Sequence, residues 1–198
     1  MALRIKSCFL CKLSDTRLNT VPGEGNPKTN IMFIGEAPGQ NEDSEGRPFI
    51  GRAGSMLDRL LKSVGLSRKD IYITNMLKCR PPENRDPSLS EITSCSDYLD
   101  QQISLINPQV IVTLGRFSFR KFFPDKSPKK YRGIILDWHG RKILPMYHPA
   151  AALYNPNLIP RLLSDFNKLT DFITDLPVQE NISAEQFPSE PTQLKLFK

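Results

Sequence analysis

The alternation of apolar and polar residues predicts short buried strands separated by amphipathic helices. Four apolar runs rich in β-branched or aromatic residues indicate strands at residues 31–35, 71–75, 110–115 and 143–146. Apolar residues at helical spacing indicate helices at residues 54–64, 88–106, 116–123 and 158–176. This alternation is typical of an α/β protein with a mainly parallel sheet that helices cover on both faces.

Turn and cap residues predict where these elements end. Glu91 follows Ser88 at capping-box spacing, which predicts the start of a helix, and Gly65 predicts the end of the 54–64 helix. Pro145 cannot donate a ladder hydrogen bond, so the fourth strand is expected near a sheet edge or end. Three prolines in residues 78–87 predict a loop.

Polar residues follow the predicted strands at the point where each strand ends. Glu36, Asn75, Arg116 and His148 all occupy such positions, and ligands of open α/β sheets bind beyond the carboxyl ends of the strands. The loop at residues 35–49 adds four carboxylates and Phe49, an aromatic residue that is unusual in a polar loop. These positions predict a functional site.

Size and composition suit one globular domain, which we place at residues 1–176 of the 198. Residues 177–198 are rich in Pro, Gln, Glu and Ser and are expected to form a flexible tail. No apolar run is long enough to cross a bilayer, and residues 1–8 lack the apolar core of a signal peptide, so a cytoplasmic protein is expected.

Positive charge is concentrated in one part of the chain. The formal net charge is +6, and residues 116–142 carry nine Lys or Arg against two Asp. Such a run is often a solvated surface, but it is also typical of a face that meets phosphates.

Four cysteines, Cys8, Cys11, Cys79 and Cys95, are all that the chain contains. Four thiolates suit a tetrahedral zinc or an iron–sulfur cluster. Only Cys8 and Cys11 form a close pair, and this spacing fits a cluster rather better than a zinc knuckle. The alternative is that Cys79 and Cys95 are ordinary core residues.

Several motifs together resemble the family-four uracil-DNA glycosylases. They are GEAPG at residues 35–39, GRPF at 46–49, TN at 74–75, KCRPP at 78–82 and HPA at 148–150. The resemblance covers residues 8–176. It implies a three-layer α/β/α sandwich around a four-stranded parallel sheet and a [4Fe–4S] cluster on the four cysteines, with zinc as the alternative. It also implies cleavage of the N-glycosidic bond of deoxyuridine in DNA, leaving an abasic site.

The resemblance also implies roles for individual residues. Asn75 would read the edge of a flipped uracil, Phe49 would stack on its face, and His148 would donate a hydrogen bond to uracil O2. We favour Glu36 as the residue that orients the attacking water. Glu42 would support the loop or line the pocket near uracil C5, and it is the alternative candidate for the water.

Other positions complete this interpretation. The backbone at Ala37 and Gly39 is expected to help hold the water and base. Leu153 would wedge into the duplex, and Tyr154 stands where the family commonly has an arginine. The basic segment supplies further expected DNA contacts: Lys129, Lys130 and Arg132.

The tail ends in an apolar segment that resembles the bacterial sliding-clamp-binding motif. Its expected contacts are Gln193, Leu194, Leu196 and Phe197, and chance similarity is the alternative.

The sequence therefore predicts a monomeric DNA-repair enzyme that acts on the nucleoid. The alternative is a non-catalytic nucleic-acid-binding module with a structural metal. A nucleoside triphosphate is a poor ligand for the acidic 35–49 loop, which lacks a P-loop lysine.

Overall fold

The computed structural model describes residues 1–173, and the tail motif at residues 193–197 lies outside them. Its centre is a six-stranded sheet with the order β1-β3-β2-β4-β6-β5. The four middle strands are parallel and match the four predicted runs: β3 (Tyr72–Asn75), β2 (Ile31–Gly35), β4 (Val110–Leu114) and β6 (Arg141–Met146). The predicted α/β class and parallel core are confirmed.

The predicted number of strands was wrong. Two short antiparallel strands, β1 (Glu24–Gly25) and β5 (Leu136–Trp138), extend the sheet at its two edges. With two and three residues, they are too short to show a periodic pattern in the sequence. β6 lies next to the edge strand β5, which agrees with the expected place near the sheet edge, and β5 pairs only with residues 141–143, so Pro145 lies beyond its end.

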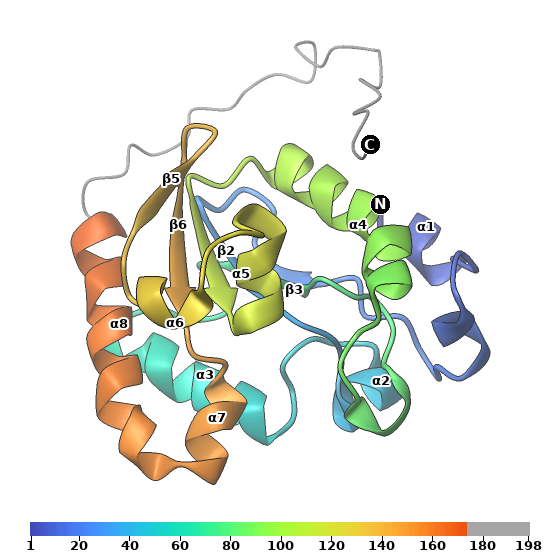
Figure 1. Ribbon diagram of the computed structural model, residues 1–198, viewed down its shortest axis with the longest axis horizontal. Helices are drawn as coiled ribbons and strands as arrows, with labels where there is room; N and C mark the ends of the chain where they lie inside the picture. Colours follow the sequence, from blue (N-terminus) through green and yellow to red (C-terminus); the bar gives the residue numbers. More distant parts are fainter. Residues whose placement is uncertain (174–198) are drawn as a thin grey trace.

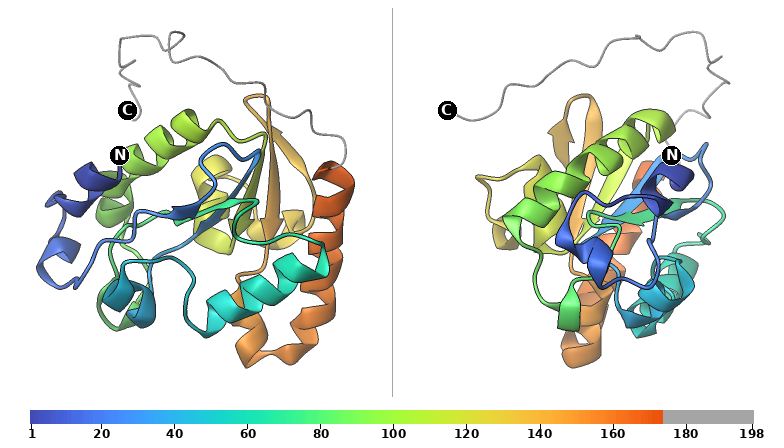
Figure 2. Two further views of the ribbon diagram at one scale, coloured as in Figure 1. Left: turned by 180° about the vertical axis from the view of Figure 1, so that it is seen from behind. Right: turned by 90° about the vertical axis from the view of Figure 1, so that its right-hand side faces the viewer.

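Helices cover both faces of the sheet (Figures 1 and 2). One face packs against α3 (Arg52–Ser63), α7 (Pro149–Tyr154) and α8 (Ile159–Ile173), and the other against α4 (Leu89–Ile106) and α5 (Arg116–Phe122). Shorter helices lie in the connections: α1 (Ala2–Lys6), η1 (Lys12–Asp15), α2 (Gln40–Glu45), η2 (Pro82–Asn84), α6 (Pro128–Tyr131) and η3 (Pro156–Leu158). This arrangement is the predicted three-layer sandwich.

The side-chain period of a strand explains the two cores. In β2, Phe33 points into the core under α3 and α8, whereas Met32 and Ile34 point into the core under α4. All three side chains are fully buried. Burial on both faces is why the strand appears in the sequence as an unbroken apolar run.

The predicted limits of α3 and α4 are close to those observed. The Ser88 side chain accepts a hydrogen bond from the backbone of Glu91, and the Glu91 carboxylate accepts one from the backbone of Ser88, so the capping box is present. Gly65 has a φ of +74°, a left-handed conformation that favours glycine just after a helix. Across residues 1–173, none of the helices is both long and apolar enough to cross a membrane.

Candidate active site

The carboxyl ends of the middle strands surround one cavity of about 310 Å³. Gly35 of β2 pairs with Asn75 of β3, and His148 follows β6 as the N-cap of α7. The main predicted site residues all line this cavity: Glu36, Ala37, Gly39, Glu42, Phe49, Asn75 and His148. The cavity is also lined by residues that were not among the predicted site residues: Pro38, Ala53, Pro81, Asn84, Arg85 and Ala150.

Phe49 and His148 form an aromatic pair on one wall. Their ring centroids are 5.4 Å apart and the rings are nearly parallel, at 26°. Glycine at position 35 makes this arrangement possible, because a Cβ there would lie 2.6 Å from the Phe49 ring and would collide with the Asn75 amide oxygen. The first residue of the GEAPG motif therefore leaves room for the side chains of two other motifs.

The Asn75 side chain has an unused acceptor. Asn75 is only 2% exposed, and its Oδ1 has no hydrogen-bond partner among the described residues. An unpaired buried polar atom costs about 1–3 kcal/mol, so such an atom in a cavity wall is suited to pairing with a ligand. A planar amide can present one acceptor and one donor side by side to the same ligand edge.

The buried Lys78 side chain holds the Asn75 backbone through a hydrogen bond that the sequence did not predict. Its side chain is 1% exposed, and the ammonium donates hydrogen bonds to Asn75 O at 2.6 Å, Thr74 Oγ1 at 2.7 Å and Gln102 Oε1 at 2.7 Å. Burial lowers the Lys78 pKa to about 7, although the nearby Cys95 opposes this change. The only sequence signal for this contact is the position of Lys78 three residues after a strand end.

His148 is held as a neutral donor. Its Nδ1 accepts a hydrogen bond of 3.2 Å from the Ala150 amide, which places the ring proton on Nε2. Burial lowers the His148 pKa to about 4, and the negative charge of Glu42 offsets this only in part. The imidazole is therefore uncharged at neutral pH and has an N–H to donate.

Glu36 has an unusually high pKa for a carboxylic acid. It is partly buried in the cavity wall, and this burial is the main cause that raises its pKa to about 7. The negative charge of Asp86 also raises the Glu36 pKa, whereas the positive charge of Arg116 lowers it. Asp86 and Arg116 form an ion pair with each other. A carboxyl group poised near neutral pH is suited to proton exchange with water.

Glu42 organises the loop that carries the site. Its Oε1 accepts hydrogen bonds of 2.9 Å from the amides of Ile50 and Gly51, and its Oε2 accepts one of 3.1 Å from the amide of Gly39. Gly39 is the N-cap of α2, so one carboxylate joins the start of this helix to the segment after Phe49. These three contacts occupy Glu42 in holding the backbone.

The four cysteines come together at one place outside the strand ends. Cys8, Cys11, Cys79 and Cys95 line a second, smaller cavity between the N-terminal segment and α4. Arg17 donates to Cys79 Sγ at 3.2 Å, and the Lys78 amide donates to Cys95 Sγ at 3.3 Å. Four thiols are the ligand set of either an iron–sulfur cluster or a tetrahedral zinc. Within the described range, no group of three or more His, Cys, Asp or Glu is spaced for a single metal ion.

The predicted DNA contacts differ in exposure. Lys129 and Lys130 are exposed on α6, whereas Arg132 is partly buried with its guanidinium 3.3 Å above the Tyr147 ring. Leu153 is also partly buried and packs against the core under α3, but Tyr154 beside it is 90% exposed. Leu153 and Tyr154 line a shallow hollow of about 380 Å³, and Glu42 and Ala53 line both this hollow and the main cavity.

Comparison with known proteins agrees with this geometry. Residues 22–176 match the family model of the uracil DNA glycosylase superfamily, and the chain belongs to that superfamily. Within it, the chain is similar to type-4 uracil-DNA glycosylases. Identity is 53% over 175 residues with that of Sulfurisphaera tokodaii, covering 83% of this chain and 80% of the relative. It is 48% with that of Archaeoglobus fulgidus (83% and 87%) and 46% with that of Thermotoga maritima (86% and 91%). The resemblance drawn from the motifs is thereby confirmed.

Proposed function

We propose that this protein is a monofunctional uracil-DNA glycosylase that removes uracil from DNA and leaves an abasic site for base excision repair. The observation that carries this proposal is the unpaired, buried Oδ1 of Asn75 in a cavity walled by Phe49 and His148. An enzyme that acts on a base must take it out of the stack and read its edge in such a pocket. The family and its type-4 relatives support the same activity.

Base recognition follows from the hydrogen-bonding groups of Asn75. Its Oδ1 accepts from uracil N3–H while its amide donates to uracil O4. Cytosine presents an acceptor at N3 and a donor at C4, so it leaves buried groups unpaired on both sides. The Phe49 ring covers one face of the base, and Glu42 holds the backbone amides of Ile50 and Gly51, the two residues after Phe49.

Bond cleavage is helped at both ends of the breaking bond. As the bond opens, the departing uracil becomes negative, and the neutral His148 donates its Nε2–H to uracil O2. The sugar becomes positive, and the Glu36 carboxylate stabilises it and orients the attacking water. The backbone at Ala37 and Gly39, which also lines the cavity, helps to hold this water and the base.

The cysteine cavity is proposed to hold a [4Fe–4S] cluster bound by Cys8, Cys11, Cys79 and Cys95. A bound cluster would fasten the N-terminal segment to the 78–87 loop and α4, the three segments that supply the thiols. Purified protein should contain about four iron and four sulfide per chain. Cys79→Ala should lose the iron, and zinc in place of iron in the wild type would overturn this assignment.

The activity is tested by release of free uracil from a uracil-containing oligonucleotide, single- or double-stranded, without added nucleotide. Wild type should release uracil, and Asn75→Asp should lose most of this activity and gain some against cytosine. Asn167→Asp, an exposed change on α8, is the matched control and should behave as wild type. If the wild type releases no uracil, the protein is a non-catalytic binding module instead.

Partners and location extend the same proposal. The protein is proposed to act as a cytoplasmic monomer on the nucleoid, with the exposed Lys129 and Lys130 near the DNA backbone. Residues Gln193, Leu194, Leu196 and Phe197 are proposed to bind a bacterial-type sliding clamp. Deleting residues 193–197 should abolish binding to purified clamp and leave cleavage of short DNA intact; lost cleavage would contradict a purely clamp-directed role.

A further inference from the structure

The backbone of Phe49 adopts a conformation that needs support. Its φ is +53°, in the left-handed region that large side chains rarely occupy. Its carbonyl also lies so close to Gly54 of α3 that a Cβ there would collide with the oxygen. The position of the Phe49 ring therefore depends on whatever holds this segment of backbone in place.

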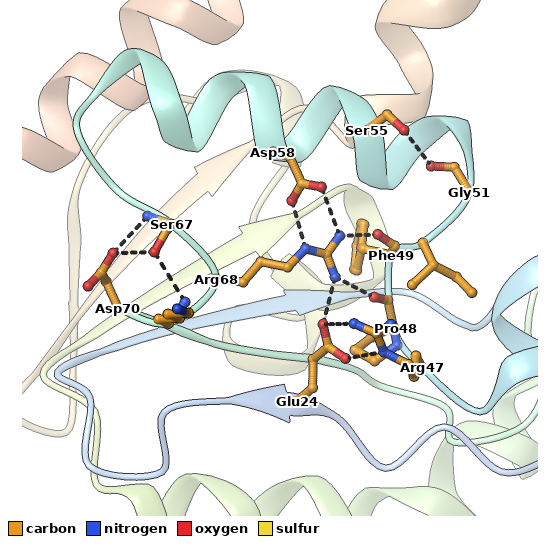
Figure 3. Close-up of polar contacts among 12 residues, drawn as sticks. Glu24, Arg47, Pro48, Phe49, Gly51, Ser55, Asp58, Ser67, Arg68 and Asp70 are labelled. Atoms are coloured by element: carbon orange, nitrogen blue, oxygen red, sulfur yellow. Dashed lines mark hydrogen bonds and ion pairs between the residues drawn. The ribbon is translucent and has the colours of Figure 1, made fainter.

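Arg68, which lies in the connection between α3 and β3, supplies that support (Figure 3). Its guanidinium donates to the carbonyl oxygens of both Pro48, at 3.0 Å, and Phe49. The same group also pairs with two carboxylates: the Nη1 that donates to Pro48 lies 2.8 Å from Glu24 of β1, and Nε lies 2.7 Å from Asp58 of α3. One side chain thus ties the cavity wall to a strand and a helix.

The geometry suits arginine and no other residue. A planar guanidinium has five N–H donors in a fixed fork, so it can satisfy two carbonyls and two carboxylates together. The Arg68 side chain is only 22% exposed, and charge-assisted hydrogen bonds of this kind are stronger than neutral ones. Lysine would keep the charge but could not span all four acceptors.

We infer that Arg68 is a positioning residue for uracil excision, which acts by fixing the Phe49 ring against the flipped base. This inference rests on the proposed stacking role of Phe49. Arg68 does not line the cavity itself, so its effect on the reaction passes through the Phe49 backbone.

The test is a double-mutant cycle on single-turnover uracil release, with DNA affinity and thermal unfolding measured on the same proteins. Arg68→Met should lower the rate about 10- to 100-fold, as expected when a substrate-holding group is misplaced, and Arg68→Lys should restore only part of it. In a Phe49→Ala background, Arg68→Met should cost less than about twofold more, since the ring it positions is gone.

Arg47→Gln is the matched control, because Arg47 is an exposed arginine whose side chain, in the described part of the chain, also pairs with Glu24 but makes no hydrogen bond to Phe49. It should retain wild-type activity. Additive losses in the cycle, or wild-type rates in folded Arg68→Met and Arg68→Lys, would overturn the inference. If Arg68→Met does not fold, the cycle is run with Arg68→Lys. Wild-type activity in Phe49→Ala would overturn both the stacking role and this inference. A wild-type protein that releases no uracil would instead contradict the proposed activity.

Discussion

The Lys78 ammonium donates a 2.6 Å hydrogen bond to the backbone carbonyl of Asn75. The backbone amide of the same lysine donates to Cys95 Sγ at 3.3 Å. One buried residue therefore touches both the residue proposed to read the base and a thiol of the cysteine cavity. The main cavity and the cysteine cavity are joined by a direct chain of contacts through Asn75, Lys78 and Cys95.

Removing this ammonium should destabilise the protein. Lys78→Met keeps the volume but removes the ammonium donor from the Asn75 carbonyl, and leaves the Gln102 amide oxygen with only the 3.3 Å contact to the Thr74 hydroxyl, so a loss of about 2–4 kcal/mol is expected. Urea unfolding measures it. Lys62→Met, at an exposed position on α3, is the control and should change stability by less than about 0.5 kcal/mol. A Lys78→Met loss as small as that of the control would show that the three hydrogen bonds contribute little.

The pH dependence of uracil release should follow Glu36. The carboxylate is the form that stabilises the cationic sugar, so kcat/KM should rise as pH increases through about 7, the raised pKa of this group. His148, with a pKa lowered to about 4, stays neutral over that range and adds no second transition near 6.5.

Glu36→Gln should remove this rise and lower kcat/KM about 100-fold or more. The check is a profile from pH 5 to pH 9 for both proteins at constant ionic strength. A wild-type profile that is nearly flat across this range, as expected for a glutamate with its ordinary pKa of 4.5, would mean that burial does not tune Glu36.

Glu42→Gln should weaken both stability and activity. Glutamine has one oxygen where the carboxylate uses two, so at least one of the amides of Gly39, Ile50 and Gly51 loses its acceptor. A loss of about 1–3 kcal/mol and a lower rate of uracil release are expected. Glu45→Gln, at an exposed position on the same helix, should leave both unchanged. Full stability with altered base preference would instead support a role beside uracil C5.

The sequence predicted which residues lie together at the main cavity because strand positions and chain topology can be inferred from it. Apolar runs located the four middle strands, and the topology of a parallel sheet then brought Glu36, Asn75 and His148 to one edge. The motifs added Phe49 and the four cysteines. Each strand or motif is recognised from a few neighbouring residues, and the parallel topology then brings the strand ends together.

Arg68 and Lys78 escaped prediction because their roles depend on contacts that no short pattern encodes. Arg68 reaches back 19 residues to Phe49 and 44 to Glu24, and Lys78 reaches forward 24 residues to Gln102. A lysine in a polar, Pro-rich loop ordinarily predicts solvent exposure, whereas here the fold supplies three acceptors that allow its burial. The strands β1 and β5 were missed for a different reason, their length.

The residue that enters the DNA duplex should be Tyr154 rather than Leu153. The two side chains are neighbours at the end of α7, but Leu153 packs against the core while Tyr154 is 90% exposed at the hollow beside the main cavity. An exposed aromatic ring can stack on a base, which is worth about 1–3 kcal/mol. Tyr154→Ala should therefore weaken binding to uracil-containing duplex about 5- to 100-fold without changing stability.

Leu153→Ala serves as the contrasting variant. Because it removes part of a packed side chain, it should lower the free energy of unfolding by about 1–3 kcal/mol, with a smaller effect on DNA affinity. Fluorescence anisotropy with labelled duplex and thermal unfolding separate the two effects. The reverse result, with weak binding in Leu153→Ala and wild-type binding in Tyr154→Ala, would mean that α7 rearranges on DNA to expose Leu153, and would restore it as the wedge.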